Sequence, residues 1–221
     1  MKGLLIKDFR LIKMQKNFFL IIAMISIGFI VSSGGNTGYL SYAIGFSCFA
    51  SSLFSLSTVS YDEFDNGNPF LFSLPITRKN YVLEKYCFGV MTGFGCWLLF
   101  SGLAAFFVLY NGLALTGERI VSALILIPFF LLLLAILLPL TLKFGSEKSR
   151  FAVIGVFGII FLLGYLGNHV VKTFGIDLSP VVRPLASLSA EALIGGLTVL
   201  SLLLLLLSLN ISISIVKKKE F

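Results

Sequence analysis

The chain has 221 residues, of which 57% are hydrophobic and 12% are charged, and its mean hydropathy is +1.01. This is too little polar surface to cover a soluble globular protein. The composition therefore excludes a soluble globular protein and predicts an all-α, polytopic membrane protein. The formal net charge of +7 does not indicate nucleic-acid binding, because the basic residues flank apolar runs and form no patch interleaved with exposed aromatic residues.

The first segment, residues 1–16, is basic and precedes the first apolar run. Leu5, Phe9 and Ile12 share one stripe of a helix at positions i, i+4 and i+7, although Ile6 interrupts the pattern. We expect an interfacial helix along the inner leaflet; the alternative is a simple cytoplasmic extension of the first span. A cleaved signal peptide fits less well, because the basic lead is long and further apolar runs follow.

The apolar runs predict six transmembrane helices, since a bilayer core needs about 20 apolar residues per helix. The first is short, and its flanks or a tilt would have to extend it. The expected spans are Phe18 to Val31, Tyr39 to Ser60, Tyr86 to Tyr110, Ile120 to Leu142, Phe151 to Gly167 and Ala192 to Val216.

The basic residues predict the orientation, because cytoplasmic loops retain Lys and Arg. With a cytoplasmic N-terminus, the outer segments hold only Arg119, Lys172 and Arg183 of the 17 basic residues. We therefore expect a single transmembrane domain over residues 1–221 in the plasma membrane, with both termini cytoplasmic. Its main connections would be a cytoplasmic loop at 61–85 and an outer loop at 168–190.

The 61–85 loop is the longest mostly polar interval in the chain. It has acidic residues at its start, an Asn66-Gly67 turn signal, a short apolar patch, and then Thr77 as an N-cap for a helix through Arg78 and Lys79. The apolar patch is too short to span a bilayer. We expect a short amphipathic element that lies at the membrane interface or in a partner's groove; the alternative is an ordinary solvated connector.

Catalytic and metal-binding patterns are not expected. His169 has no His or Cys partner at ligand spacing, and the only Lys-Ser and Lys-Thr pairs follow Glu147 and Val171 where a phosphate-binding loop needs glycine. The expected spans contain no charged residue, and Lys85 and Lys143 lie at their inner ends. Coupling to a proton or sodium gradient is therefore disfavoured.

Small residues form two patterns inside the spans. Ser47, Ser51, Ser55 and Thr58 recur on one helix face, and Gly89 and Gly93 form a Gly-x-x-x-Gly pair. Such faces favour close helix packing, and the serine face is also compatible with a conduit lining.

The stretches "LIKDFRL" at 5–11 and "LFSLPITRKNYVLEKY" at 71–86, with acids at the exit of the second span, resemble the small six-span permease subunits of type-2 ABC exporters. The resemblance is nearest to the Gram-positive permeases that include those of the phenol-soluble-modulin exporters. The "DNGN" at 65–68 departs from the more helical run of such proteins.

The resemblance implies a permease that exports an apolar or amphipathic substrate, such as a peptide, toxin or antimicrobial, and is not itself an enzyme. It would bind no cofactor or metal; ATP and Mg would be held by a separate cytoplasmic ABC ATPase, and a second permease subunit would complete a dimer. The implied ATPase contacts lie in the N-terminal segment and the 61–85 loop: Lys7, Asp8, Phe9, Arg10, Tyr61, Asp62, Glu63, Asp65, Phe70, Leu71, Phe72, Leu74, Arg78 and Lys79.

The residues leave two alternatives open. One is a stand-alone immunity or sensory protein that binds a peptide without transport. The other is an intramembrane enzyme, which is disfavoured because the expected spans offer serines without an adjacent His or Asp.

Overall fold

The computed structural model describes residues 2–64, 67–73, 75–174 and 189–219, and every regular element among them is helical. The helices are α1 (Lys2–Met14), α2 (Lys16–Ser32), α3 (Thr37–Glu63), α4 (Gly67–Ser73), α5 (Arg78–Tyr110), α6 (Gly117–Leu124), α7 (Leu126–Phe174) and α9 (Ala190–Lys218). The predicted all-α class is therefore confirmed.

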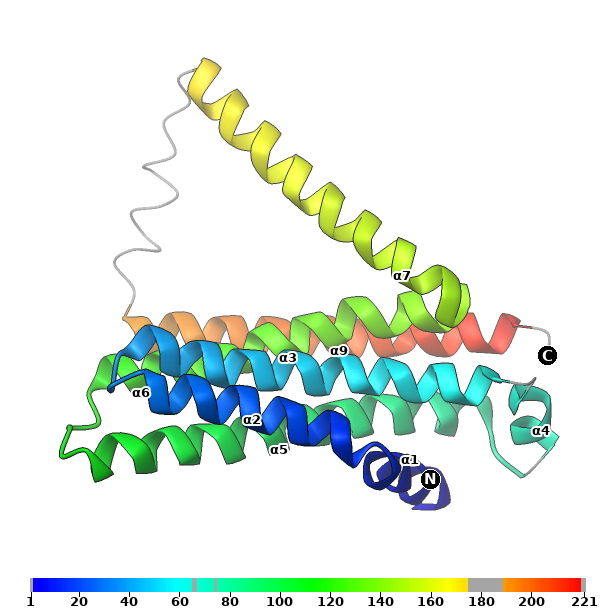
Figure 1. The fold of residues 1–221 in the computed structure, drawn as a ribbon. Helices are drawn as coiled ribbons and strands as arrows, with labels where there is room; N and C mark the ends of the chain where they lie inside the picture. Colours follow the sequence, from blue (N-terminus) through cyan, green and yellow to red (C-terminus); the bar gives the residue numbers. More distant parts are fainter. Residues whose placement is uncertain (1, 65–66, 74, 175–188, 220–221) are drawn as a thin grey trace.

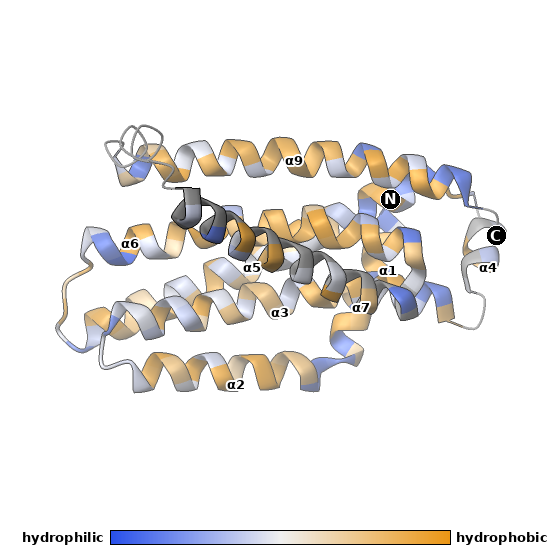
Figure 2. Ribbon diagram, turned by 90° about the horizontal axis from the view of Figure 1, so that it is seen from above, coloured by the Kyte–Doolittle hydropathy of each residue, from blue (hydrophilic) through white to orange (hydrophobic). Residues whose placement is uncertain are grey.

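Four helical stretches in the described residues are long and apolar enough to cross a membrane: Thr37–Glu63, Arg78–Tyr110, Gly117–Gly145 and Ala190–Lys218. A fifth is reached if α1 and α2, which meet at a bend of 66°, form one broken span. Figure 2 shows apolar residues along the helix centres and hydrophilic residues gathered toward the helix ends. This is the pattern of a multi-pass membrane protein.

The long helices run side by side, with α3 packed against α2, α5 and α7, and α9 packed against α7 and α5 (Figure 1). The core between them is apolar and includes Ile44, Val82, Phe130, Leu134 and Leu138. Helices α1 and α4 and the last turn of α9 lie toward one end of the bundle, called the α4 end below. Helix α6 and the start of α9 lie toward the other, the α6 end.

Several expected boundaries are wrong. Residues 61–63, placed in the expected loop, are helical, because α3 continues to Glu63. The third span, expected from Tyr86, belongs to α5, which begins at Arg78 as the helix predicted through Arg78 and Lys79 does. Thr77 is the N-cap of α5, as predicted, and its side chain accepts a hydrogen bond of 3.2 Å from the Asn80 amide. At the other expected loop, 168–174 belong to α7, and 175–188 lie outside the described residues.

The span expected at Ile120 to Leu142 is divided between α6 and α7. Pro128 follows the break, and because proline has no amide hydrogen it cannot bond to the carbonyl of Leu124, four residues earlier. The helix is interrupted there but keeps its direction well enough for Gly117–Gly145 to count as one span.

Gly145 divides α7 into two arms, 126–144 and 146–174, which Figure 1 shows separating at the α4 end. Its φ of 77° and ψ of 174° lie in a region that is essentially restricted to glycine. The second arm contains the expected span Phe151 to Gly167, which is not among the four stretches above.

Candidate functional site

The most unusual feature of the bundle is a group of charged side chains near the α4 end, here called the charge cluster. It combines residues from three helices that are distant in sequence. They are Lys7 and Asp8 of α1, Asp62 of α3, and Glu84 and Lys85 of α5.

Lys85 is the centre of the charge cluster. Its ammonium nitrogen Nζ lies 2.5 Å from Asp8 Oδ2, 2.7 Å from Asp62 Oδ2 and 3.2 Å from Thr58 Oγ1. The contacts to Asp8 and Thr58 are hydrogen bonds, and the contact to Asp62 is an ion pair. The Lys85 side chain is fully buried, and only this pairing makes a buried charge tolerable.

Lys7 closes the charge cluster on its solvent side. Its side chain is about a third exposed; it pairs with Asp62 Oδ1 and lies 3.2 Å from Asp8 Oδ1. Burial by itself would raise the pKa of the Asp8 carboxyl, but the ammonium groups of Lys85 and Lys7, with hydrogen bonds, hold that pKa below its ordinary value. Asp8 is therefore an anion that fixes α1 to α5.

The buried face of α1 differs from the expected one. Leu4 and Asp8, one turn apart, are the buried residues of α1, whereas Phe9 of the expected apolar stripe is exposed. Phe9 still contacts the Phe88 ring edge-to-face at 5.4 Å between centroids. The ion pairs of Asp8, together with the buried Leu4 side chain and the Phe9–Phe88 contact, attach α1 to the bundle in place of the expected stripe.

A second ionic contact lies at the same end. Lys219 Nζ is 3.0 Å from Glu63 Oε1 and 3.3 Å from the Leu142 carbonyl, and Glu63 also lies beside Gly145. Arg78 donates to the carbonyls of Val216 and Lys217, at 3.1 and 2.7 Å. Because the last carbonyls of a helix lack intrahelical partners, the guanidinium caps the C-terminal end of α9.

A hydrogen-bonded chain joins α5, α7 and α9 in the bundle interior. Pro139 cannot donate to the Ala135 carbonyl, and Ser208 of α9 donates to that carbonyl instead, at 2.5 Å. Since the Ser208 hydrogen is used, Tyr86 donates to Ser208 at 2.6 Å and accepts from Ser212 at 2.8 Å. The proline thus creates an acceptor that a neighbouring helix satisfies.

The predicted ATPase contacts fall into three groups. Phe9, Arg10, Tyr61, Phe70 and Lys79 are exposed; Lys7, Glu63, Leu71 and Arg78 are half-buried; Asp8 and Asp62 are buried in the charge cluster. Asp65 and Leu74 lie outside the described residues, and for Phe72 only its place in α4 is described. Contact with an ATPase stays a prediction for all of them.

The small-residue faces are packed inside the bundle. Ser47, Ser51, Ser55 and Thr58 are fully buried, and Ser47, Ser51 and Thr58 each donate to a carbonyl of α3 itself. A Cβ added at Gly93 would lie 2.8 Å from the Phe130 ring, and one at Gly89 would lie 3.0 Å from Leu134. In this conformation both faces serve close helix packing; a conduit role stays a prediction.

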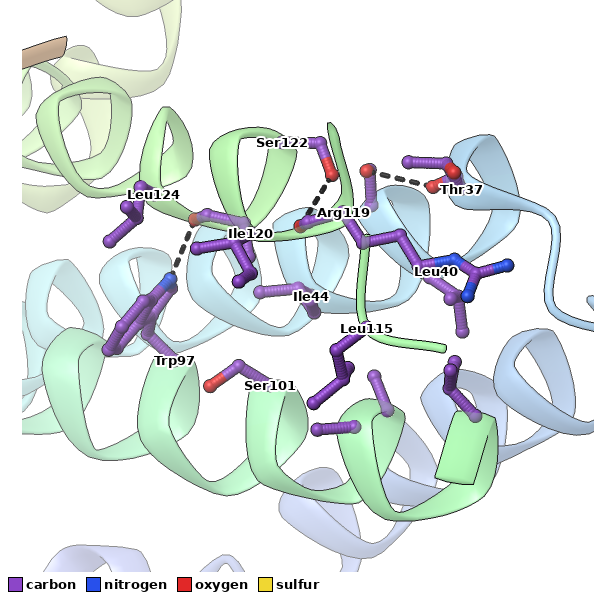
Figure 3. A pocket seen from close by; sticks show the side chains of 15 residues that line it. Thr37, Leu40, Ile44, Trp97, Ser101, Leu115, Arg119, Ile120, Ser122 and Leu124 are labelled. Carbon is purple, nitrogen blue, oxygen red and sulfur yellow. Dashed lines mark hydrogen bonds between the residues drawn. The ribbon is translucent and has the colours of Figure 1, made fainter. Parts of the chain in front are cut away.

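A cavity of about 220 Å³ lies toward the α6 end between α3, α5 and α6 (Figure 3). Its lining is mostly apolar and includes Leu40, Ile44, Leu115 and Ile120. Trp97 Nε1 donates to the Ala123 carbonyl at 2.8 Å, which fixes the indole at the wall. The Arg119 guanidinium, also at the wall, bonds the carbonyls of Gly35 and Ala114.

Sequence reasoning missed Glu84 and the central place of Lys85, because it placed both residues outside the third span, with Lys85 at its inner end. Their side chains are fully buried two turns into α5, so the expectation that the helix interiors lack charged groups is wrong at this end. The available signal was weak: Glu84 and Lys85 directly precede the apolar run that begins at Tyr86, and Asp8 is the one acidic residue of the basic N-terminal segment.

The chain matches the family described as ABC-2 family transporter protein over residues 3–217. No curated protein and no solved structure matches it. The match covers nearly the whole chain and agrees with the multi-pass helical structure. This protein therefore belongs to the ABC-2 family of transporter proteins.

Proposed function

We propose that the chain is the permease subunit of an ATP-driven exporter, powered by a separate cytoplasmic ABC ATPase that docks on the α4 end. Family membership supports the permease role. The observation that carries the docking proposal is the surface of the α4 end. Aromatic and basic side chains are exposed there, next to the buried charge cluster.

The proposed docking surface consists of Phe9, Arg10, Tyr61, Phe64, Phe70 and Lys79. The aromatic members are 42% (Phe9), 46% (Tyr61), 72% (Phe64) and 71% (Phe70) exposed. Aromatic residues and arginine are the side chains that contribute most to binding at protein interfaces. The charge cluster and the Glu63–Lys219 pair next to this surface connect α1, α3, α5 and α9. A movement of the docked ATPase would therefore be transmitted to the transmembrane helices.

The second arm of α7 supports a sixth span. Gly145 lies at the α4 end and α9 begins toward the α6 end, so the chain between them must return across the full bundle. The described part of that return, 146–174, is helical and carries the apolar run Phe151 to Gly167. Six spans, with the α4 end and both termini cytoplasmic, satisfy this geometry and the distribution of basic residues.

The proposed cargo is an apolar or amphipathic molecule such as a peptide, toxin or antimicrobial. The mostly apolar cavity toward the α6 end and the resemblance to phenol-soluble-modulin exporter permeases support this class. A second permease subunit would complete the conduit, because the serine face of α3 is buried in the helix contacts of this one bundle.

The alternative is a stand-alone immunity or sensory protein that binds a peptide without transport. Dependence on an ATPase separates the two. The chain should be co-expressed with candidate ABC ATPase subunits, purified in detergent, and assayed for bound ATPase and for stimulated ATP hydrolysis. The test variant is Phe70→Ala with Lys79→Ala at the α4 end; the matched control is Tyr110→Ala with Glu118→Ala at exposed positions of the α6 end.

We expect an ATPase to co-purify with the unaltered chain and with the control, and at least tenfold less with the α4-end variant, about 1.4 kcal/mol of binding. Failure of the folded, unaltered chain to capture any ATPase would overturn the proposal and favour the stand-alone protein. Equal capture by all three would move the docking surface elsewhere.

A further inference from the structure

The charge cluster contains more acidic than basic side chains. Its acids are Asp8, Asp62 and Glu84, and its bases are Lys7 and Lys85. The two lysines pair with the two aspartates. With every group ionised, one negative charge would remain, and it would fall on Glu84.

Glu84 is the member without a donor. Its side chain is fully buried, and neither carboxyl oxygen has a hydrogen-bond partner among the described residues. Lys85 Nζ lies 3.7 Å from Glu84 Oε2, beyond hydrogen-bonding distance, and has nearer oxygens in Asp8, Asp62 and Thr58. An ionised, unpartnered carboxylate sealed from water costs several kcal/mol, so such a group gains a partner or becomes neutral.

Asp8 supplies the missing partner. Its Oδ1 takes no well-aligned hydrogen bond, although Lys7 Nζ is 3.2 Å away. The Asp8 and Glu84 carboxyls lie around the same Lys85 Nζ, with oxygens at 2.5 and 3.7 Å from it, and so are neighbours that can share one hydrogen bond. Two ionised carboxyls have no hydrogen to share. One proton on Glu84 gives the pair its hydrogen bond and removes the excess charge.

We propose that Glu84 is a proton-binding site: it holds a proton at neutral pH and donates it in a hydrogen bond to the Asp8 carboxylate, which fixes α1 to α5. The charged or titratable groups around it are Lys7 and Asp8 from α1 and Tyr81 and Lys85 from α5, and Asp62 of α3 lies on the other side of Lys85. The bound proton makes the charge cluster neutral overall.

The attachment of α1 therefore depends on pH. As pH rises through the titration of Glu84, the proton leaves, the hydrogen bond to Asp8 is lost, and an unpaired negative charge remains inside. The folded chain thus loses stability at alkaline pH. Glu84→Gln removes this dependence, since its amide donates the same hydrogen bond and does not titrate.

The test uses the purified full chain in lipid nanodiscs, without any ATPase. Infrared difference spectra between neutral and alkaline pH report the carbonyl stretch of a buried protonated carboxyl, and thermal unfolding is followed over the same pH range. Glu84→Gln is the test variant, and Glu118→Gln, an exposed acid in the first turn of α6, is the control. Asp8→Asn is a second variant that keeps Glu84 and changes its acceptor.

We expect a protonated-carboxyl band in the unaltered chain and the control, lost in Glu84→Gln and shifted in frequency in Asp8→Asn. We also expect the midpoint of thermal unfolding to fall at alkaline pH in the unaltered chain and to stay nearly level in Glu84→Gln. Absence of the band from the unaltered chain overturns the proposal whatever the variants do. So does a midpoint that depends on Na⁺ or K⁺ in place of pH, since a cation would then balance the charge.

Discussion

Lys85 of α5 and Asp8 of α1 form an ion pair of 2.5 Å between two fully buried side chains that are 77 residues apart in sequence. This contact attaches the N-terminal helix to the bundle more directly than any apolar stripe on α1. Lys85 also pairs with Asp62 near the end of α3. A movement of α1 or of the end of α3 would therefore change the contacts of the same atom, Lys85 Nζ. The pair therefore joins the proposed docking surface to the spans.

Lys85→Met tests how much this ion pair contributes to the stability of the fold. The substitution leaves Asp8 and Asp62 inside the bundle without their main counter-ion, and breaking a buried ion pair in this way costs about 3–5 kcal/mol. We expect a loss of that order in the free energy of unfolding, measured by denaturant titration in mixed micelles. Lys13→Met, at an exposed position of α1, serves as the control. Similar losses in both variants would contradict the central place of Lys85.

Gly93→Ala tests the close approach of α5 and α7. The new methyl group would lie 2.8 Å from Cε2 of the Phe130 ring, so the ring or the helix must shift, at a cost of about 1–3 kcal/mol. Gly95→Ala, two residues away, meets nothing within 4 Å. We expect a lower thermal midpoint in detergent for Gly93→Ala only; an unchanged midpoint would mean that the two helices are not packed this closely.

Gly145→Ala tests the division of α7. The backbone there has φ of 77°, and a Cβ would also meet Glu63 Oε2 at 3.2 Å. We expect a loss of about 1–3 kcal/mol, the usual cost of a strained backbone conformation. Gly155→Ala, in open space on the helical second arm, should be neutral or slightly stabilising. The comparison is made by thermal unfolding, and equal midpoints would argue for a continuous helix at 145.

Tyr86→Phe removes one hydroxyl from the chain that joins α5, α9 and α7. Ser208 keeps its bond to the Ala135 carbonyl, but Ser212 loses its acceptor. We expect about 1 kcal/mol of lost stability, since hydrogen bonds between membrane helices contribute about 0.6–2 kcal/mol. Tyr110→Phe, on a side chain that is 81% exposed, is the control and should show no change in the same unfolding assay.

The sequence predicted what depends on local pattern. Apolar runs gave the membrane class and the approximate position of each described span, and Thr77 was correctly expected to cap α5 because a capping side chain acts within one turn. The alternation of basic and apolar segments also predicted which connections lie at the same end of the bundle.

What it missed depends on partners far along the chain. In the sequence, Glu84 and Lys85 resemble the polar start of a span. In the structure, their burial depends on α1, whose Asp8 pairs with Lys85. Arg78 looks like a residue that marks the cytoplasmic side, but it caps α9, 138 residues away. The accepting carbonyl at Ala135 could have been inferred from Pro139, although not its partner Ser208.

The most direct test of the account places a photo-cross-linking phenylalanine analogue at Phe70 of α4, or at Tyr110 at the far end of α5, in cells that also express the candidate ATPase. Both side chains are more than two-thirds exposed, so the two positions differ mainly in the end of the bundle that they report. A cross-linked ABC ATPase is expected from position 70 and none from position 110. An ATPase captured from position 110, or from neither position while the chain is folded in the membrane, would contradict it.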